Sequence, residues 1–431
     1  MRLSASRLLR AAAFLTVGLL ATTANATTPT EQQGGSRAIL LQGFHWNSSS
    51  YSNPDWYNVL KNNAADLKAM GFTHVWFPPP SDSAAAQGYL PRQLNVLNSS
   101  YGSSTDLQNA VTAFTGTSNG ASVRAIVDVV VNHRVGTTGW YDFTNPTWSQ
   151  YTIVNNDECN CGWGAADTGE GFSGGRDLDH TNVGEVQNGI TSWMNNVLKP
   201  VGFSGIRFDF VKGYGASYAG QYANSFKAEF CVGEMWPDSF DLNNLDANRQ
   251  AIMNWINGTN DSCGAFDFTT KGILNDALAN NNYWRLEDSS GKPAGAVGWW
   301  PAMSVTFVDN HDTGPAESCG SGQNLWPVPC GAVMQGYAYI LTHPGIPTVF
   351  YPHIYNWNLK SQIQSLINAR KGADVTSTSA VAIQQATTGL YAAIITGNTH
   401  KLAMKIGPNS WSPGSGWTLL TSGNDYAVWQ Q

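Results

Sequence analysis

Apolar positions along the chain form two alternating patterns. Short, almost wholly apolar runs alternate with longer segments in which apolar residues recur every three or four positions. The short runs are typical of buried strands, and the longer segments are typical of amphipathic helices. The predicted strands are 38–46, 74–77, 125–131, 205–211, 230–234, 265–268, 304–308 and 346–351. Repeated βα units of this length predict a closed (β/α)8 barrel of the α/β class, a TIM barrel.

An open, doubly wound sheet is the alternative architecture, but no glycine-rich phosphate loop supports it. Between the strands, the spacing of apolar residues predicts helices over 55–70 and 185–198. Thr105 and Gln108 have the spacing of a capping box that opens another helix.

Two segments depart from the βα pattern. Residues 134–182 are rich in Gly, Asn, Asp, Thr and Trp without clear periodicity, which indicates an irregular B domain inserted after the third strand. The final part of the chain instead contains short strand-like runs separated by turn residues, which predicts an antiparallel β domain. The expected division is a barrel over 37–133 and 183–370, the B domain over 134–182, and the C-terminal domain over 371–431.

The N-terminus has the pattern of a secretory signal peptide over residues 1–26. Three arginines precede a short apolar core, and a small-x-small cleavage site ends at Ala26. The apolar core is too short to span a bilayer, which argues against a membrane anchor. The mature chain is therefore expected to begin near Thr27, with a disordered lead-in over 27–36, and to be secreted.

Composition narrows the possible partners. Charged residues make up 12% of the chain and the formal net charge is −7, which disfavours nucleic acid and anionic membranes. Aromatic residues also make up 12%, and their ring faces suit sugars, although most of them are expected to fill the core.

Six cysteines in an exported chain indicate disulfides, and six allow fifteen pairings. We favour Cys231 with Cys263, which lie at similar offsets from two strand-like runs. Cys319 with Cys330 could close a loop, whereas the pairing of Cys159 and Cys161 is left open. Free buried thiols are the alternative. A zinc site is disfavoured because no histidine cluster accompanies the cysteines.

Charged residues are concentrated at the carboxyl ends of the predicted strands, where a (β/α)8 barrel carries its active site. Arg207 and Asp209 lie two residues apart in one strand-like run, where a structural ion pair is the alternative explanation. Glu234 ends the next run, and Asp312 follows a later one. Carboxylates from separate strands, without a nucleophilic cysteine or a cofactor loop, favour glycoside hydrolysis.

Several motifs resemble the conserved blocks of the α-amylase family, glycoside hydrolase family 13. They are HVWFPP at 74–79, DVVVNH at 128–133, GIRFD at 205–209, Glu234 and FVDNHD at 307–312. Further motifs, among them GWWPA at 298–302 and GNDYAVW at 423–429, are most similar to plant-type α-amylases. The resemblance covers essentially the whole mature chain. Cys231 and Cys263 are instead similar to cysteines of microbial maltooligosaccharide-forming amylases.

The resemblance implies roles for the residues at the strand ends. Asp209 would be the nucleophile, Glu234 the general acid and base, and Asp312 the third carboxylate. Arg207 would keep Asp209 ionised by lowering its pKa. A retaining enzyme would hold the carboxyls of Asp209 and Glu234 about 5–5.5 Å apart. The residues implied in substrate binding are Tyr89, His133, Arg207, Lys212, His311, Trp299 and Trp300.

The irregular segment has oxygen ligands that suit Ca²⁺. By resemblance, one calcium site would comprise Asn132, Asp167, the Glu170 carbonyl, Asp177 and the Gly213 carbonyl. Solvated loop aspartates are the alternative. The two tryptophans 299 and 300 match a surface sugar-binding pair; since neighbouring residues of a strand face opposite ways, both cannot be core on one strand face, although packing remains an alternative role.

The sequence therefore predicts a secreted, calcium-dependent, retaining α-amylase that attacks internal α-1,4 bonds of starch. The expected partners are starch and α-1,4-glucan oligosaccharides, with no nucleic acid, no membrane and a monomeric chain. An exo-acting maltooligosaccharide-forming amylase is one alternative, and a starch-binding protein without activity is another.

Overall fold

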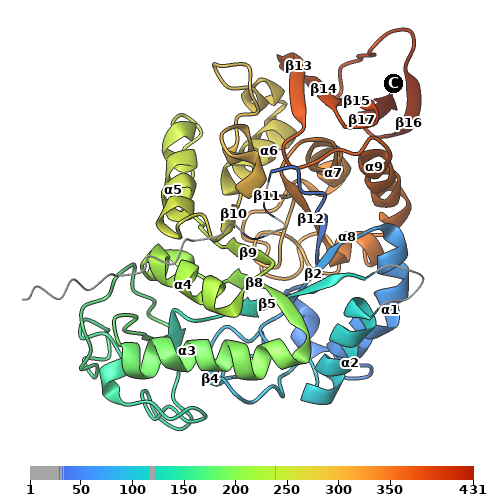
Figure 1. The fold of residues 1–431 in the computed structure, drawn as a ribbon. Coiled ribbons are helices and arrows are strands. Elements are labelled where there is room, and N and C mark those ends of the chain that lie inside the picture. Colours follow the sequence, from blue (N-terminus) through green and yellow to red (C-terminus); the bar gives the residue numbers. More distant parts are fainter. Residues whose placement is uncertain (1–28, 30–31, 33, 117–121, 238) are drawn as a thin grey trace, which may run out of the picture.

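Eight parallel strands close into a barrel, as predicted. The computed structural model describes residues 29, 32, 34–116, 122–237 and 239–431 (Figure 1). Around the barrel, the strand order is β1-β12-β11-β10-β9-β8-β5-β2, and each neighbouring pair is parallel. The strands are β1 Leu40–Gln42, β2 His74–Phe77, β5 Arg124–Val129, β8 Phe203–Phe208, β9 Phe230–Gly233, β10 Gly264–Phe266, β11 Ser304–Phe307 and β12 Ile346–Phe350.

Most barrel strands end before the predicted limit, and this places the polar residues just beyond them. The run predicted as strand over 205–211 has its strand at Phe203–Phe208, so Asp209 is the first residue past β8. The backbone N–H of Asp209 still donates to the carbonyl of Val129 at 3.0 Å. The carboxylate is therefore fixed at the mouth of the barrel by the last rung of the β5–β8 pairing.

Helices follow the apolar periodicity with small differences in their caps. Helix α1, Trp56–Met70, begins after Asp55, whose side chain accepts the N–H of Asn58. The predicted capping box at Thr105 is wrong: the cap of α2 is Ser103, paired with Asp106. The helices are α1 Trp56–Met70, α2 Ser104–Thr115, α3 Asn188–Trp193, α4 Ala216–Phe226, α5 Leu245–Gly258, α6 Phe268–Asn280, α7 Val333–Thr342, α8 Tyr351–Tyr355 and α9 Lys360–Gly372. Two π-helical turns, Val183–Gln187 and Met194–Leu198, flank α3 and complete the helix predicted over 185–198.

The irregular segment leaves and re-enters the barrel through one short antiparallel ladder. Strand β6, His133–Arg134, pairs with β7, Arg176–Asp177, so that His133 lies opposite Asp177. A second short ladder joins β3, Asp82–Ser83, to β4, Pro91–Gln93. The β6–β7 ladder joins both ends of this irregular segment, which we call the excursion, to the barrel mouth.

Three disulfides join all six cysteines, and the two favoured or suggested pairings are confirmed. Cys231 in β9 is bonded to Cys263, directly before the neighbouring strand β10. Cys319 and Cys330 close a loop after β11. The pair left open in the sequence, Cys159 and Cys161, is also a disulfide.

The C-terminal part is a five-stranded antiparallel sheet, which lies beside α7 and α9 (Figure 1). Its order is β13-β14-β15-β17-β16. The strands are β13 Ala380–Thr387, β14 Leu390–Thr396, β15 Lys401–Ile406, β16 Thr418–Gly423 and β17 Tyr426–Gln430. The strand-like runs predicted there correspond to β13, β14, β15 and β17. Edge strand β16 escaped prediction because it has no buried residue to give it an apolar alternation.

The signal peptide predicted over 1–26 lies outside the described residues. The expected disorder of the lead-in is wrong for Gln32, which is buried and accepts the backbone N–H of Cys231 at 3.0 Å. The backbone N–H of Ser36 likewise donates to the hydroxyl of Ser377. Among the described residues, no helix is long and apolar enough to cross a membrane.

Candidate active site

Arg207 organises the carboxylates at the barrel mouth. Its side chain, near the end of β8, is fully buried. Nη1 lies 2.8 Å from Oδ1 of Asp128 and 2.7 Å from Oδ1 of Asp209. Nη2 lies 2.8 Å from Oε2 of Glu234. The pair in the sequence is therefore more than a structural ion pair, since one guanidinium binds carboxylates from three successive barrel strands or their ends.

Asp209 and Glu234 are in direct contact. Their side chains share a hydrogen bond, and the backbone N–H of Phe210 also donates to Oε2 of Glu234 at 3.2 Å. The nearest carboxyl oxygens are therefore closer than the expected 5–5.5 Å, because Arg207 draws both groups to adjacent arms of its guanidinium. Such close contact leaves no space between the two carboxyls for the water molecule of an inverting site.

Burial raises the pKa values of both carboxyls. The pKa of Asp209 is raised to about 6, mainly by burial, while Arg207 opposes this rise. Arg207 does lower the pKa of Asp209, as expected, but the loss of solvation on burial outweighs this effect and the net shift is upward. Burial also raises the pKa of Glu234 to about 7, and the negative charge of Asp209 adds to this shift.

Asp312 lines the same cavity as Asp209 and Glu234 and has its own set of partners. One oxygen accepts the carboxamide N–H of Gln323 at 2.6 Å, and the other lies 3.1 Å from Nε2 of His311. Gln42 in β1 fixes the far nitrogen of that imidazole at 2.8 Å. Burial raises the pKa of Asp312 well above its ordinary value, and the charge of Glu234 adds to the shift.

Aromatic rings form the remaining walls. Tyr89 stacks on His311 with ring centroids 5.2 Å apart, and on Trp46 at 6.4 Å. The carbonyl of Tyr89 lies 2.8 Å from Nε2 of His133, whose ring stacks on Phe172. These residues, together with the three carboxylates, enclose an inner cavity of about 240 Å³. Flat rings beside carboxylates suit a sugar, which has apolar C–H faces and hydroxyl edges.

Lys212, Trp299 and Trp300, which were also predicted to contact substrate, are not among the residues that line this cavity. Lys212 lines an adjoining cavity, and its Nζ is 3.1 Å from Glu170. Trp299 and Trp300 follow a 3₁₀ turn and do not belong to a strand, so the argument from opposite strand faces does not hold for them. Trp299 is 39% exposed and the guanidinium of Arg249 lies over its ring, whereas Trp300 packs partly against the core.

The predicted calcium ligands converge beside the barrel mouth. Oδ1 of Asn132 and Oδ2 of Asp167 are buried and accept no hydrogen bond from the described residues. Burial raises the pKa of Asp177 to about 7, and the negative charge of Asp167 adds to the rise. A side chain at Gly213 would collide with Oδ1 of Asn132 at 2.1 Å, which shows how closely this backbone approaches the amide. Unpaired hard oxygens and crowded negative charge fit a bound cation such as Ca²⁺.

The predicted ligand Glu170 lies on the same wall, where its backbone N–H donates to the carbonyl of Lys212 at 3.0 Å. Gly169 is pressed against the backbone of Gly213, because a Cβ there would lie 2.4 Å from the Gly213 carbonyl carbon. The excursion therefore touches the segment after β8 at the point where the predicted ligands meet.

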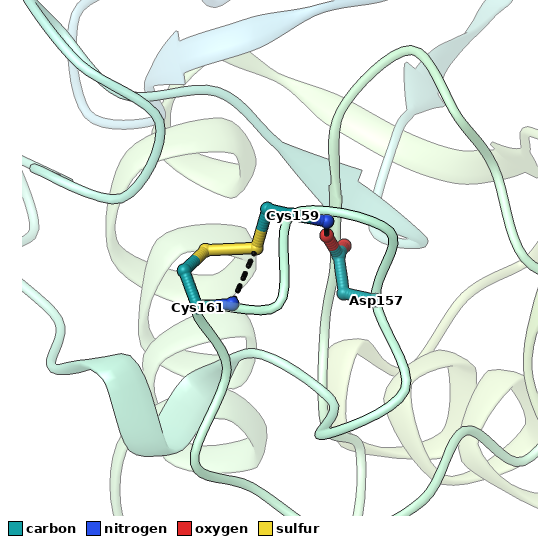
Figure 2. A group of neighbouring side chains, drawn as sticks. All are labelled: Asp157, Cys159 and Cys161. Atoms are coloured by element: carbon teal, nitrogen blue, oxygen red, sulfur yellow. Dashed lines mark hydrogen bonds between the residues drawn. A yellow bond between two sulfur atoms is a disulfide. The ribbon is translucent and has the colours of Figure 1, made fainter.

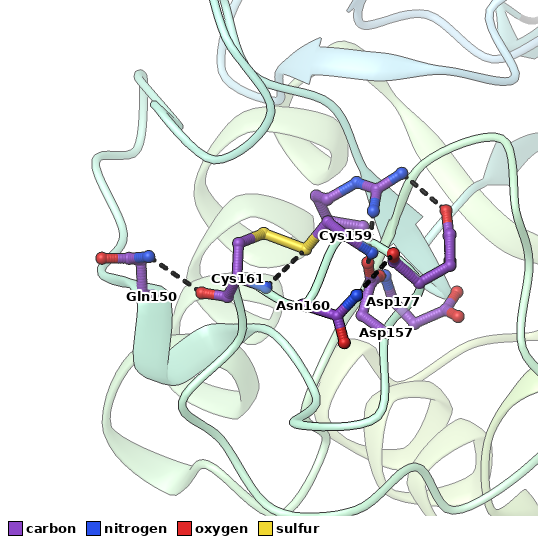
Figure 3. The surroundings of a disulfide bond; sticks show 8 residues. Gln150, Asp157, Cys159, Asn160, Cys161 and Asp177 are labelled. Carbon is purple, nitrogen blue, oxygen red and sulfur yellow. Dashed lines mark hydrogen bonds and ion pairs between the residues drawn. A yellow bond between two sulfur atoms is a disulfide. The ribbon is translucent and has the colours of Figure 1, made fainter.

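Asp157, Cys159 and Cys161 also lie close together, but they do not make a metal site (Figure 2). The disulfide removes both thiolates that a metal would need. Figure 3 shows how this turn adjoins Asp177: the carboxylate of Asp157 accepts the backbone N–H of Asp177 at 2.9 Å and also pairs with Arg176. We interpret the Cys159–Cys161 turn as a structural element that stabilises the excursion through these contacts of Asp157.

Several residues with direct contacts were missing from the predicted site. Asp128 begins the DVVVNH motif and was given no role, although it binds both Arg207 and the hydroxyl of Tyr89. Phe172 and Gln323 lie in irregular segments that have no sequence periodicity. Of these residues, Gln42 could have been found from the sequence, because it is a polar residue inside a short apolar run.

The chain is similar to known proteins over most of its length. Residues 372–430 match the family described as the alpha-amylase C-terminal beta-sheet domain. The chain is 44% identical to "Probable alpha-amylase 2" of Arabidopsis thaliana, over 92% of this chain and 94% of that protein. It is 33% identical to "Glucan 1,4-alpha-maltotetraohydrolase" of Stutzerimonas stutzeri, over 88% and 70% of the two chains. The fold matches the crystal structure of a Geobacillus thermoleovorans α-amylase complexed with acarbose, with a TM-score of 0.65 at 17% identity, over 93% and 98% of the chains.

The barrel with carboxylates at its strand ends is the architecture of a glycoside hydrolase. Within that class, identity to plant and bacterial relatives over most of their length is decisive: the chain belongs to the α-amylase family, glycoside hydrolase family 13.

Proposed function

We propose that the protein is a retaining endo-amylase that hydrolyses internal α-1,4 bonds of starch and related glucans, and that Asp209, Glu234 and Asp312 do the chemistry. The observation that supports this proposal best is that Arg207 forms ion pairs with both Asp209 and Glu234. These ion pairs hold two buried carboxyls together at the barrel mouth. Their opposed duties need one ionised and one protonated group, and the pKa of Glu234 is the higher of the two.

In the first half of the reaction, Glu234 donates its proton to the glycosidic oxygen while a carboxylate oxygen of Asp209 attacks the anomeric carbon. The C–O bond to the leaving chain breaks, and a covalent glycosyl ester forms. In the second half, Glu234 takes a proton from water, the hydroxyl attacks the same carbon, and Asp209 leaves as a carboxylate. The configuration is inverted twice and hence retained.

Asp312 and the rings around it would hold the sugar during these steps. A negative charge at Asp312 stabilises the positive charge that develops on the sugar ring in the transition state. Tyr89 offers a ring face, and the imidazoles of His133 and His311 line the cavity beside it. The imidazoles are neutral, since burial lowers their pKa values.

A product time course on soluble starch tests the endo mode. Because the proposed substrate chain passes through the site, early products should be long oligosaccharides, with iodine colour lost well before reducing ends accumulate. The name of the Stutzerimonas relative supports a second candidate, an exo-acting enzyme. One dominant short product from the first minutes would favour that enzyme over the endo-amylase.

The pKa values predict a bell-shaped activity profile. Asp209 must be ionised, so kcat/KM should fall as the pH drops below about 6. Glu234 must be protonated, so kcat/KM should also fall as the pH rises above about 7. Initial rates at low substrate concentration, in buffers of constant ionic strength, measure both limbs. A rate that keeps rising above the pKa of Glu234 would contradict its role as the acid.

We also propose that Asn132, Asp167, Asp177 and the carbonyls of Glu170 and Gly213 bind one Ca²⁺. A bound ion would neutralise the crowded carboxylates and join the excursion to the segment after β8. Chelation should then lower the melting temperature by about 5 °C or more, and added Ca²⁺ should restore it.

A matched pair of variants separates this site from general effects of the chelator. In Asp177→Asn the shift on chelation should be smaller than in the wild type. In Asp142→Asn, which changes a half-buried aspartate of the same excursion outside the proposed ligand set, the shift should be unchanged. Equal melting temperatures of the wild type with and without chelator would count against the site.

We propose export for this chain, supported by the signal pattern at the N-terminus and by three disulfides, which persist in oxidising compartments. Isolation of a culture-medium form that begins near Thr27 would support this location; an intracellular form that retains the first residues would contradict it.

A further inference from the structure

A buried ion pair joins α6 to the turn that supplies Asp312. Lys271 lies in the first turn of α6, and Asp309 lies two residues after β11; both side chains are fully buried. Nζ of Lys271 is 2.6 Å from Oδ1 of Asp309. A buried pair of this kind contributes little net stability, because desolvation of both charges offsets their attraction. The proposed reaction uses neither group, so the pair requires another explanation.

The turn after β11 is closed by its own side chains. Oδ1 of Asn310 accepts the backbone N–H of Asp312 at 3.0 Å and that of Thr313 at 2.8 Å. The backbone N–H of Asn310 donates to the hydroxyl of Thr313 at 3.1 Å. A Cβ at Gly314 would lie 2.5 Å from the Cβ of Asp309, so the turn packs back against its first residue. The backbone at Asp312 is therefore coupled to Asp309 through one compact turn.

Lys271 balances the charge of Asp309 and fixes its side chain. Oδ1 of Asp309 accepts Nζ of Lys271 and also the backbone N–H of Val328 at 3.2 Å. The other oxygen accepts no hydrogen bond from the described residues, and Nε2 of His353 lies 4.0 Å from it. Burial lowers the pKa of His353 to about 3, so that imidazole is neutral. The positive charge that compensates Asp309 is thus the ammonium of Lys271.

The same ammonium also holds a second segment. Nζ of Lys271 donates to Oδ1 of Asn275, one turn further along α6, at 2.9 Å. The carboxamide of Asn275 donates in turn to the backbone carbonyl of Trp326 at 3.0 Å and to that of Pro327 at 3.3 Å. Lys271 therefore fixes the loop over 319–330 through Asn275.

That loop contacts both the backbone and the carboxylate of Asp312. The backbone N–H of Leu325 donates to the carbonyl of Asp312 at 3.0 Å. The carboxamide of Gln323 donates to the carboxylate of Asp312 at 2.6 Å. The two segments that hold Asp312 are thus both joined to Lys271, which itself lines neither the inner cavity nor the adjoining one.

We propose that Lys271 is a positioning residue for Asp312, which it holds in place against the sugar through Asp309 and Asn275. This proposal rests on the proposed function, because it takes the role of Asp312 from it. Without the ammonium, the turn after β11 and the loop over 319–330 lose their common attachment to α6. A displacement of about 1 Å in a catalytic group can lower a rate on the order of 10²-fold.

Lys271→Met tests the proposal, because it keeps a long unbranched side chain and removes the charge. On starch, kcat should fall about 10- to 100-fold. KM should stay within about twofold, since Asp312 acts on the charge that develops in the transition state. A Lys271→Met enzyme with wild-type kcat would overturn the proposal.

Arg370→Met is the matched control. Arg370 is also a fully buried cation, but it donates to the backbone carbonyls of His343 and Gly345, which precede β12. These residues lie at the amino ends of the strands, away from the active site. Arg370→Met should lower the melting temperature and leave kcat within about twofold at temperatures where the variant is folded. An equal fall of kcat in both variants would show a general effect of lost stability and would overturn the proposal.

A double-mutant cycle with Asp312→Asn separates positioning from a structural role. Asp312→Asn alone should lower kcat by about 10²- to 10³-fold, which leaves a rate that is measurable at high enzyme concentration. If Lys271 acts through the carboxylate of Asp312, adding Lys271→Met should lower this residual kcat by less than about twofold. The same fold loss in both backgrounds would overturn the proposal.

A second variant guards against a folding defect in Lys271→Met, which leaves the charge of Asp309 buried and unpaired. Lys271→Met combined with Asp309→Asn removes both charges, so the melting temperature should recover. The attachment of the turn to α6 is still lost, so kcat should remain about tenfold below the wild type. A recovered melting temperature together with wild-type kcat would overturn the proposal.

Two results distinguish failure of this proposal from failure of the proposed function. Wild-type kcat in Asp312→Asn would refute the role of Asp312 in the reaction. A crystal structure of Lys271→Met tests the positioning whatever that role is: the carboxylate of Asp312 should be displaced by about 1 Å relative to Asp209. A carboxylate that stays in place would overturn the positioning role of Lys271 alone.

Discussion

Asp209→Asn should abolish starch hydrolysis, with kcat reduced on the order of 10⁴-fold or more, as for other residues that form a covalent intermediate. An amide oxygen is a poor nucleophile, so no glycosyl ester would form. The substitution keeps the size of the side chain, and Arg207 keeps its ion pairs with Asp128 and Glu234. The protein should therefore stay folded and still bind glucans.

Initial rates on starch, a melting curve and a glucan-binding isotherm measure these three outcomes together. Asp66→Asn is a matched control, because it makes the same chemical change at a surface ion pair with Lys360 and should leave kcat within about twofold. Wild-type rates in Asp209→Asn would refute the assignment. A collapsed melting curve would show instead that the carboxylate is needed for folding.

Glu234→Gln should lower kcat on starch by about 10²- to 10⁴-fold, the contribution typical of general acid catalysis. The glutamine side chain has no proton to donate to the glycosidic oxygen. Substrates with a leaving group such as fluoride do not need that proton, so they should lose much less in the first step. The alkaline limb of the pH profile should also disappear, since the group that titrates at about 7 is gone.

The comparison between starch and a glycosyl fluoride separates the two carboxylates. Asp209→Asn should lose activity on both substrates, whereas Glu234→Gln should lose mainly its activity on starch. Glu229→Gln, at the surface pair with Arg124, is the matched control and should resemble the wild type. Equal losses on both substrates in Glu234→Gln would contradict its role as the acid.

The barrel could be predicted from the sequence because its strands are buried on both faces. Runs such as β5 and β12 are almost entirely apolar, so they can be recognised as buried strands from their own sequence alone. Strand β16 has the opposite character: it is an exposed edge of the C-terminal sheet, and its pairing with β17 depends on backbone hydrogen bonds that the side-chain pattern does not encode.

The site divides in the same way. Arg207 and Asp209 could be recognised in the sequence because burying charges within an apolar run is costly unless they are paired or have a function. Gln323 and Phe172 could not, because they reach the cavity from irregular loops whose course is set by tertiary contacts. The direction of the pKa shift of Asp209 was also out of reach, since it depends on whether burial or Arg207 contributes more.

The central claim is that Asp209 forms a covalent bond to the sugar. A fluorinated maltosyl fluoride that reacts in the first step but is hydrolysed slowly in the second should accumulate as an ester. Mass spectrometry of the digested protein should then find the added sugar on the peptide that contains Asp209, and no label in Asp209→Asn. A label on another carboxylate, or no label together with products released in the inverted configuration, would contradict the account.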